Sequence, residues 1–110
     1  MQPIFLLFTE PSPPRNLTAK SVNSTAIRVK WALPLHPNGV VQYKLSTRLS
    51  TENESQNKVL FEGLATAFLV SGLEEYVMYS FTVVSVNFKY SWTSTPVVAV
   101  ETTHPAGIFQ

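Results

Sequence analysis

The stretch LEEYVMYSFTVVSV, residues 73–86, alternates in its middle between large apolar and small polar side chains. Tyr79, Phe81 and Val83 project to one side of an extended chain, and the serine and threonine between them project to the other. This period of two residues is typical of a β-strand with one buried face. We therefore expect a strand here, with its three large side chains in the core of an all-β domain.

Similar stretches lie on either side of this strand. In the clearest one, Ile27, Val29 and Trp31 alternate with Arg28 and Lys30, which predicts a strand with one face toward water. The other expected strands cover residues 15–20, 41–45, 58–62, 68–70 and 96–102, separated by loops that are polar or contain glycine or proline. Seven short strands without a helical period indicate a sandwich of two antiparallel sheets.

Leu73 precedes Tyr79 by six residues, so the leucine lies at the turn before the strand and the tyrosine near its start. A tyrosine there can bury its ring and turn its hydroxyl back onto the upstream backbone, an arrangement called a tyrosine corner. Together with Trp31 and the strand spacing, this corner resembles the fibronectin type III family over Pro13 to Thr102. The resemblance implies a seven-stranded immunoglobulin-like β-sandwich with sheets A-B-E and C′-C-F-G in that family's lettering. The core residues that we expect are Trp31, Tyr43, Leu73, Tyr79, Phe81 and Val83.

The ends of the chain differ in composition from its middle. Residues 1–12 hold an apolar run, Ile4–Phe8, and the start of a proline cluster. The run is too short for a signal peptide and no basic residue precedes it, so we expect a lead-in from a preceding domain. Residues 13–103 are expected to form the domain, and residues 104–110 a C-terminal linker. No run approaches the roughly 20 apolar residues that span a bilayer, so we expect no membrane insertion within the chain.

The composition argues against several classes of function. The net charge is +1, which does not favour nucleic acid as a partner, and cysteine is absent. The two histidines, His36 and His104, lack metal-ligand spacing, and the neighbouring Glu74 and Glu75 lie in an expected turn. No phosphate-binding or nucleotide fingerprint occurs. We therefore expect a module without enzymatic activity, cofactor or metal.

Three Asn-x-Ser/Thr sequons begin at Asn16, Asn23 and Asn53, all at positions expected to be exposed, and they are candidates for glycosylation. A second surface feature is basic. Lys20, Arg28 and Lys30 are expected on the outer face of sheet A-B-E, where a heparin-like anion could bind. Charged side chains commonly decorate the wet face of a sheet, and we favour that interpretation.

The expected loop over residues 87–93 holds three aromatic residues but no Arg-Gly-Asp, so integrin binding by that route is not supported. If Val98 and Val100 face inward, Val97 and Ala99 face outward beside outward residues of the preceding strand. The candidate partner surface therefore consists of Val84, Val86, Tyr90, Trp92, Val97 and Ala99. Valine also occurs at outward strand positions because of its β-propensity alone, and the sequence does not separate these alternatives.

Two functions remain open from the sequence. In the first, the chain is a non-enzymatic extracellular module of a cell-surface receptor, adhesion or matrix protein. Its role would be spacing and contact with a protein partner or with neighbouring repeat modules, and the three sequons favour it. In the second, it is an intracellular mechanical module of a muscle or cytoskeletal protein. Glycosylation of the native protein would distinguish the two.

Overall fold

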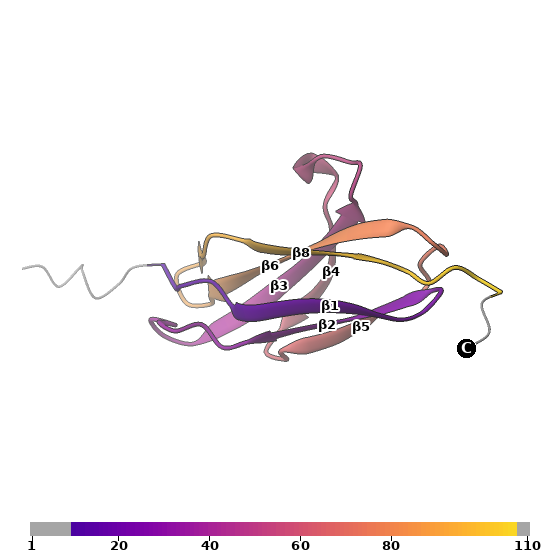
Figure 1. Ribbon diagram of the computed structural model, residues 1–110. Helices are drawn as coiled ribbons and strands as arrows, with labels where there is room; N and C mark the ends of the chain where they lie inside the picture. The colour runs from indigo at the N-terminus through magenta and orange to yellow at the C-terminus, as the bar shows by residue number, and fades with distance from the viewer. Residues whose placement is uncertain (1–9, 108–110) are drawn as a thin grey trace, which may run out of the picture.

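A computed structural model of the chain describes residues 10–107, which form two antiparallel β-sheets packed face to face (Figure 1). One sheet has the strand order β1-β2-β5; in the other, β4-β3-β6, both β7 and β8 pair with β6. The strands are β1 (Arg15–Asn23), β2 (Ala26–Ala32), β3 (Val41–Leu49), β4 (Lys58–Gly63), β5 (Ala67–Val70), β6 (Met78–Asn87), β7 (Trp92–Thr93) and β8 (Val97–Thr102). The all-β sandwich expected from the sequence is confirmed.

The core lies between the two sheets, and Trp31 connects them. Trp31 comes from β2 and is only 5% exposed. Its ring meets the ring of Tyr43 on β3 edge-on, with 5.8 Å between the centroids, and lies 6.5 Å from the ring of Phe61 on β4. Phe81 and Val83 of β6 are fully buried in the same cluster. A single indole thus packs against side chains from the opposite sheet.

The tyrosine corner is present at the start of β6. The backbone N–H of Glu74 donates a hydrogen bond to the hydroxyl oxygen of Tyr79 over 2.9 Å, and the tyrosine ring is buried. Leu73 is half-buried against the core, and its N–H donates to the carbonyl of Thr25 over 3.0 Å. These bonds fix the turn before β6 to the tyrosine ring on one side and to the β1–β2 turn on the other.

Tyr43 differs from Tyr79 in how its hydroxyl is placed. The side chain is 2% exposed, and its hydroxyl has no hydrogen-bond partner among residues 10–107. Burial raises the pKa of the Tyr43 phenol above its ordinary value, because the charged form would lose its hydration. The two tyrosines therefore contribute to the core in different ways, since Tyr43 contributes packing and Tyr79 contributes packing and a hydrogen bond.

The segment expected as one loop over residues 87–93 is partly strand, so that expectation was wrong in detail. Strand β6 runs on to Asn87, and β7 pairs with its end through Val86 and Thr93. At Ser94 the side chain takes a place in the ladder. The Ser94 N–H donates to the carbonyl of Ser85, and the Ser85 N–H donates to the Ser94 hydroxyl. The Ser94 hydroxyl thus takes the place of a backbone carbonyl as acceptor, and this interruption of the ladder separates β7 from β8.

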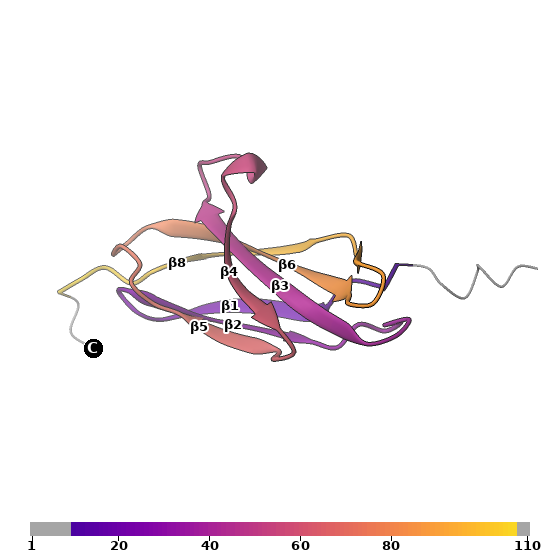
Figure 2. The same ribbon diagram turned by 180° about the vertical axis from the view of Figure 1, so that it is seen from behind.

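The described chain begins at one end of the sandwich and leaves at the other (Figures 1 and 2). We call the first end, with loops 33–40 and 88–91, the N-terminal pole. There Ser12 donates to the carbonyl of His36 over 2.8 Å, and Pro11 is fully buried. At the C-terminal pole, His104 donates to the carbonyl of Asn23 over 3.3 Å. Packed contacts thus reach slightly beyond residues 13–103, while residues 1–9 and 108–110 of the expected lead-in and linker lie outside the described residues.

Candidate interaction surfaces

On the outer face of the β4-β3-β6-β8 sheet, the residues that β8 contributes differ from those that the sequence predicted. The expectation that Val97 and Ala99 face outward was wrong, because Ala99 pairs with the fully buried Phe81 and Val97 packs against the core. Paired residues on neighbouring strands point to the same side of a sheet. Val98 and Val100 therefore face outward, and they are 51% and 50% exposed. Four apolar residues in a row carry no alternation, so the sequence could not set the phase of this strand.

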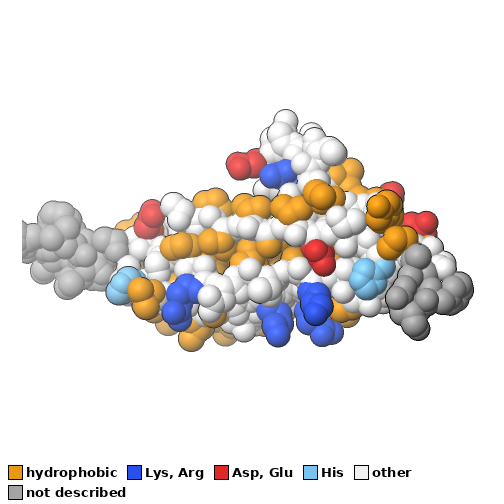
Figure 3. Space-filling view, viewed as in Figure 1, with side chains coloured by type: hydrophobic (Ala, Val, Ile, Leu, Met, Phe, Trp, Pro, Cys, Tyr) orange, Lys and Arg blue, Asp and Glu red, His pale blue; other side chains and the backbone are white. Residues whose placement is uncertain are grey.

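The outward valines of β6 and β8 form a diagonal band on this face. Val84 and Val86 are half-buried on the outer side of β6, as expected. Thr82 of β6 pairs with Val98 of β8 and precedes Val84 on the same side of β6. The two valines of β8 therefore lie diagonally from the two valines of β6, with this threonine beside both pairs. We call Val84, Val86, Val98 and Val100 the outer valine patch. Rows of hydrophobic side chains are visible along β8 in Figure 3.

The two aromatic residues of the predicted surface lie elsewhere. Trp92 pairs with Asn87, whose side chain is buried, whereas the neighbouring Val86 faces outward. Trp92 therefore points to the opposite side of the sheet from the outer valine patch, because successive strand residues alternate. Tyr90 stacks on Trp92 with 4.8 Å between the ring centroids. The predicted partner surface is thus two surfaces, a patch on the sheet and an aromatic pair at the N-terminal pole.

At this pole, Asn87 joins the two loops that form it. Its side chain is 2% exposed, and its Nδ2 donates to the carbonyl of Asn38 over 2.7 Å. Its Oδ1 accepts from the N–H groups of Lys89 and Tyr90 over 3.1 and 3.2 Å. Gly39 has φ +119°, and a Cβ there would come within 2.9 Å of Asn87 Nδ2, so glycine suits both the backbone and the contact. The bond to Asn38 spans 49 residues, so no local sequence pattern indicates it.

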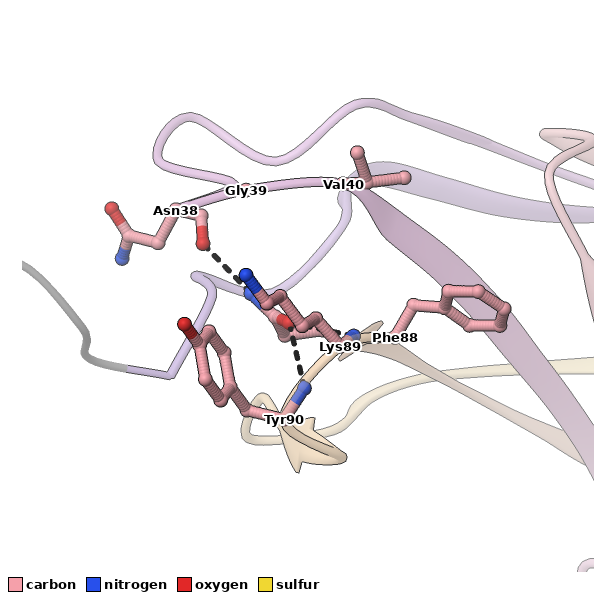
Figure 4. A pocket seen from close by; sticks show the side chains of 7 residues that line it. Asn38, Gly39, Val40, Phe88, Lys89 and Tyr90 are labelled. Atoms are coloured by element: carbon pink, nitrogen blue, oxygen red, sulfur yellow. Dashed lines mark hydrogen bonds between the residues drawn. The ribbon is translucent and has the colours of Figure 1, made fainter.

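A hollow of about 780 Å³ lies between these loops (Figure 4). Lys89 is the charged residue among those that line it, and its Nζ lies 5.4 Å from the centre of the Tyr90 ring. Phe88 points away from Tyr90 in this view and is 60% exposed. The lining residues are Asn38, Gly39, Val40, Asn87, Phe88, Lys89 and Tyr90. The hollow thus offers apolar surface beside one ammonium group. The sequence indicated its aromatic residues but not the hollow itself.

The basic residues gather on the other sheet, as expected from their alternation. Lys20 on β1 pairs directly with Arg28 on β2, and Lys30 follows two residues later on the same exposed side. Figure 3 shows Lys and Arg side chains along this edge of the molecule. Like charges directly opposite each other on a sheet are mildly unfavourable. A heparin-like anion at this face stays a prediction.

The structure places the remaining candidates on the surface. All three sequon asparagines, Asn16, Asn23 and Asn53, are exposed. His36 lies at the N-terminal pole and His104 at the C-terminal pole. Within residues 10–107, no group of three or more His, Cys, Asp or Glu side chains could hold a metal ion. No helix in this part of the chain is long and apolar enough to cross a membrane.

Comparison with known proteins identifies the family. The family described as "Fibronectin type III domain" matches residues 12–100. Human neogenin is 36% identical over 93 residues, which are 84% of this chain but 6% of that protein, so the chain spans a small part of this relative. The fibronectin type III domain of human fibronectin type III domain containing protein 3 aligns with a TM-score of 0.73 at 24% identity, covering 88% of this chain and 89% of that one. A crystal structure of titin domains aligns with the same TM-score at 19% identity, covering 86% of this chain and 32% of that one, and shows the fold alone. The chain belongs to the fibronectin type III domain family.

Proposed function

We propose that this chain is an extracellular module of a cell-surface receptor, adhesion or matrix protein, where it makes protein contacts and sets the distance between its neighbours. As a fibronectin type III domain it is of a kind that serves interaction and spacing. The observation that carries the proposal is the placement of the two ends. The described chain enters at one pole and leaves at the other, which suits one unit of an elongated array.

The outer valine patch supports the interaction part of the proposal. Its two valines on β8 are each about half exposed, and contiguous apolar surface on a folded domain commonly marks a contact site. The patch lies on the face opposite to Lys20 and Arg28, and on its own face Lys44, which pairs with Val84, borders it. The partner that suits such a face is a protein surface with apolar side chains, supplied by another protein or by a neighbouring module.

An extracellular location is favoured by the three sequons, whose asparagines are all exposed. The alternative is an intracellular mechanical module of a muscle or cytoskeletal protein. The likeness to titin domains, at 19% identity, concerns the fold and does not favour that alternative. As a fibronectin type III domain, the chain is of a kind that is generally non-catalytic. Any enzymatic activity of the parent protein would reside in its other domains.

Changing Val98 and Val100 to glutamate tests the interaction part. We expect the double variant to keep its melting temperature within about 2–4 °C, because outward surface changes cost little stability. We expect it to reduce co-purification of the native complex from cells that make the parent protein by at least about tenfold, or roughly 1.4 kcal/mol. Val22→Glu is the matched control, since Val22 is 43% exposed on the opposite sheet. Equal losses for both variants, or no loss for either, would remove the patch from the proposal.

A further inference from the structure

We propose that Asn23 and Asn53 accept N-linked glycans when this chain passes through the secretory pathway. Both residues begin a sequon, Asn23-Ser24-Thr25 and Asn53-Glu54-Ser55, and both side chains are exposed. The inference rests on the extracellular location proposed above, because sugars are transferred to asparagine in the secretory pathway. It goes further by naming which asparagines carry them and where the sugars lie on the domain.

The two sequons share one local geometry. Asn23 Oδ1 accepts hydrogen bonds from the N–H of Thr25 over 2.9 Å and from its hydroxyl over 3.3 Å. Asn53 Oδ1 accepts from the N–H of Ser55 over 3.1 Å and from its hydroxyl in the same way. In each case the hydroxyl that the sequon requires contacts the asparagine side chain directly. Both contacts span two residues, so they can form in a nascent chain before the sandwich folds.

This geometry leaves the acceptor nitrogen available. Within the described residues, Nδ2 of Asn23 and Nδ2 of Asn53 donate no hydrogen bond to the protein. Transfer from a lipid-linked oligosaccharide pyrophosphate breaks one N–H bond of Nδ2 and the bond between C1 of the first sugar and the pyrophosphate. A new bond joins Nδ2 to C1, and the pyrophosphate leaves as the proton is lost. The Oδ1 contacts are untouched, so glycosylation does not cost the folded turn a hydrogen bond.

Two asparagines outside sequons use Nδ2 as a donor to the protein. Asn38 Nδ2 donates to the carbonyl of Glu10 over 3.0 Å, and Asn87 Nδ2 donates to the carbonyl of Asn38 over 2.7 Å. The two asparagines whose Nδ2 bonds connect distant parts of the fold thus lack a sequon. Asn16 has a sequon but lies at an irregularity of β1 with φ 55°, without the turn contacts, and it is not part of the proposal.

The two sites put sugars at defined places on the domain. Asn23 lies at the C-terminal pole, where its carbonyl accepts from His104. Asn53 caps the single-turn helix η2 (Glu54–Gln56) in the loop that projects from the end of β3 in Figures 1 and 2. Neither position borders the hollow at the N-terminal pole, which residues 38–40 and 87–90 line. A glycan on Asn23 would lie beside the exit of the chain and one on Asn53 on the projecting loop, and neither would cover the aromatic pair at the N-terminal pole.

The test is secretion of the full chain, behind a cleavable signal, from mammalian cells. The reference variant is Asn16→Gln, which removes the third sequon. We expect two glycans on this reference variant, one after the further change Asn23→Gln or Asn53→Gln, and none after both changes. The glycans are counted by intact mass before and after N-glycosidase treatment. Thr25→Ser, which keeps a hydroxyl, should retain the Asn23 glycan, and Thr25→Ala, which removes it, should lose that glycan.

A secreted, folded reference variant that carries no glycan at Asn23 or at Asn53 would overturn the inference. Circular dichroism on each secreted variant establishes that it is folded, and the threonine variants test the Asn23 site with its asparagine in place. This result is independent of where the native protein resides, because the signal delivers the chain to the secretory pathway in either case. An intracellular native protein would contradict the proposed function while leaving acceptance of sugar at both sites unchanged.

Discussion

Trp31→Ala should lower the free energy of unfolding by about 3–5 kcal/mol, the largest effect of any single change that we expect. The indole is 5% exposed and packs against rings of the opposite sheet, Tyr43 at 5.8 Å and Phe61 at 6.5 Å. Its removal would leave a cavity between the sheets, because the surrounding strands are held by their own ladders and cannot close around it. A domain of this size has roughly 5–15 kcal/mol of stability in total, so the variant should be marginal.

Denaturant unfolding followed by circular dichroism measures this loss. The control is Leu69→Ala on β5, in the same sheet as Trp31 but 48% exposed. It should cost clearly less, since much of its side chain already contacts water. A Trp31→Ala chain that unfolds cooperatively at the wild-type midpoint would show that the tryptophan does not hold the two sheets together.

Tyr79→Phe should cost about 1–3 kcal/mol, although the change removes one oxygen atom. The ring would still pack, but the N–H of Glu74 would lose the acceptor that it now meets at 2.9 Å. Leaving a backbone donor without a partner in a partly buried turn costs more free energy than the hydrogen bond itself contributed. The melting temperature should fall by roughly 4–8 °C for each kcal/mol lost.

Tyr43→Phe is the matched comparison, because it deletes the same atom from another core tyrosine. The Tyr43 hydroxyl has no partner within residues 10–107, so its removal breaks no bond and relieves a buried polar group. We expect a change of less than about 0.5 kcal/mol, or a small gain in stability. Equal losses in both variants would mean that the Glu74 contact is not what makes Tyr79 important.

The sequence predicted the fold well because the fold depends on local patterns. The alternation around Trp31 and Phe81 fixed which side chains are buried, and the spacing of Leu73 and Tyr79 placed the corner. These signals work over two to six residues, and the two faces of β2 and of the first half of β6 differ clearly in polarity. The one strand with the wrong phase, β8, is the one where Val97–Val100 is apolar throughout.

The candidate surfaces were harder to predict, because they depend on contacts between distant residues. Ala99 faces inward because it pairs with Phe81, and Trp92 faces away from the outer valine patch because it pairs with Asn87. The hollow at the N-terminal pole depends on the bond from Asn87 to Asn38, across 49 residues. The sequence indicated an aromatic loop, but the pairing register determines on which side of the sheet the aromatic side chains lie.

One measurement addresses directly whether the module lies outside the cell. An antibody raised against the folded domain is applied to living cells that make the native parent protein, before and after permeabilisation. We predict full binding to intact cells, or recovery of the protein from the medium if the parent is secreted. Binding that appears only after permeabilisation, with none of the protein in the medium, would contradict the account and favour the intracellular mechanical module.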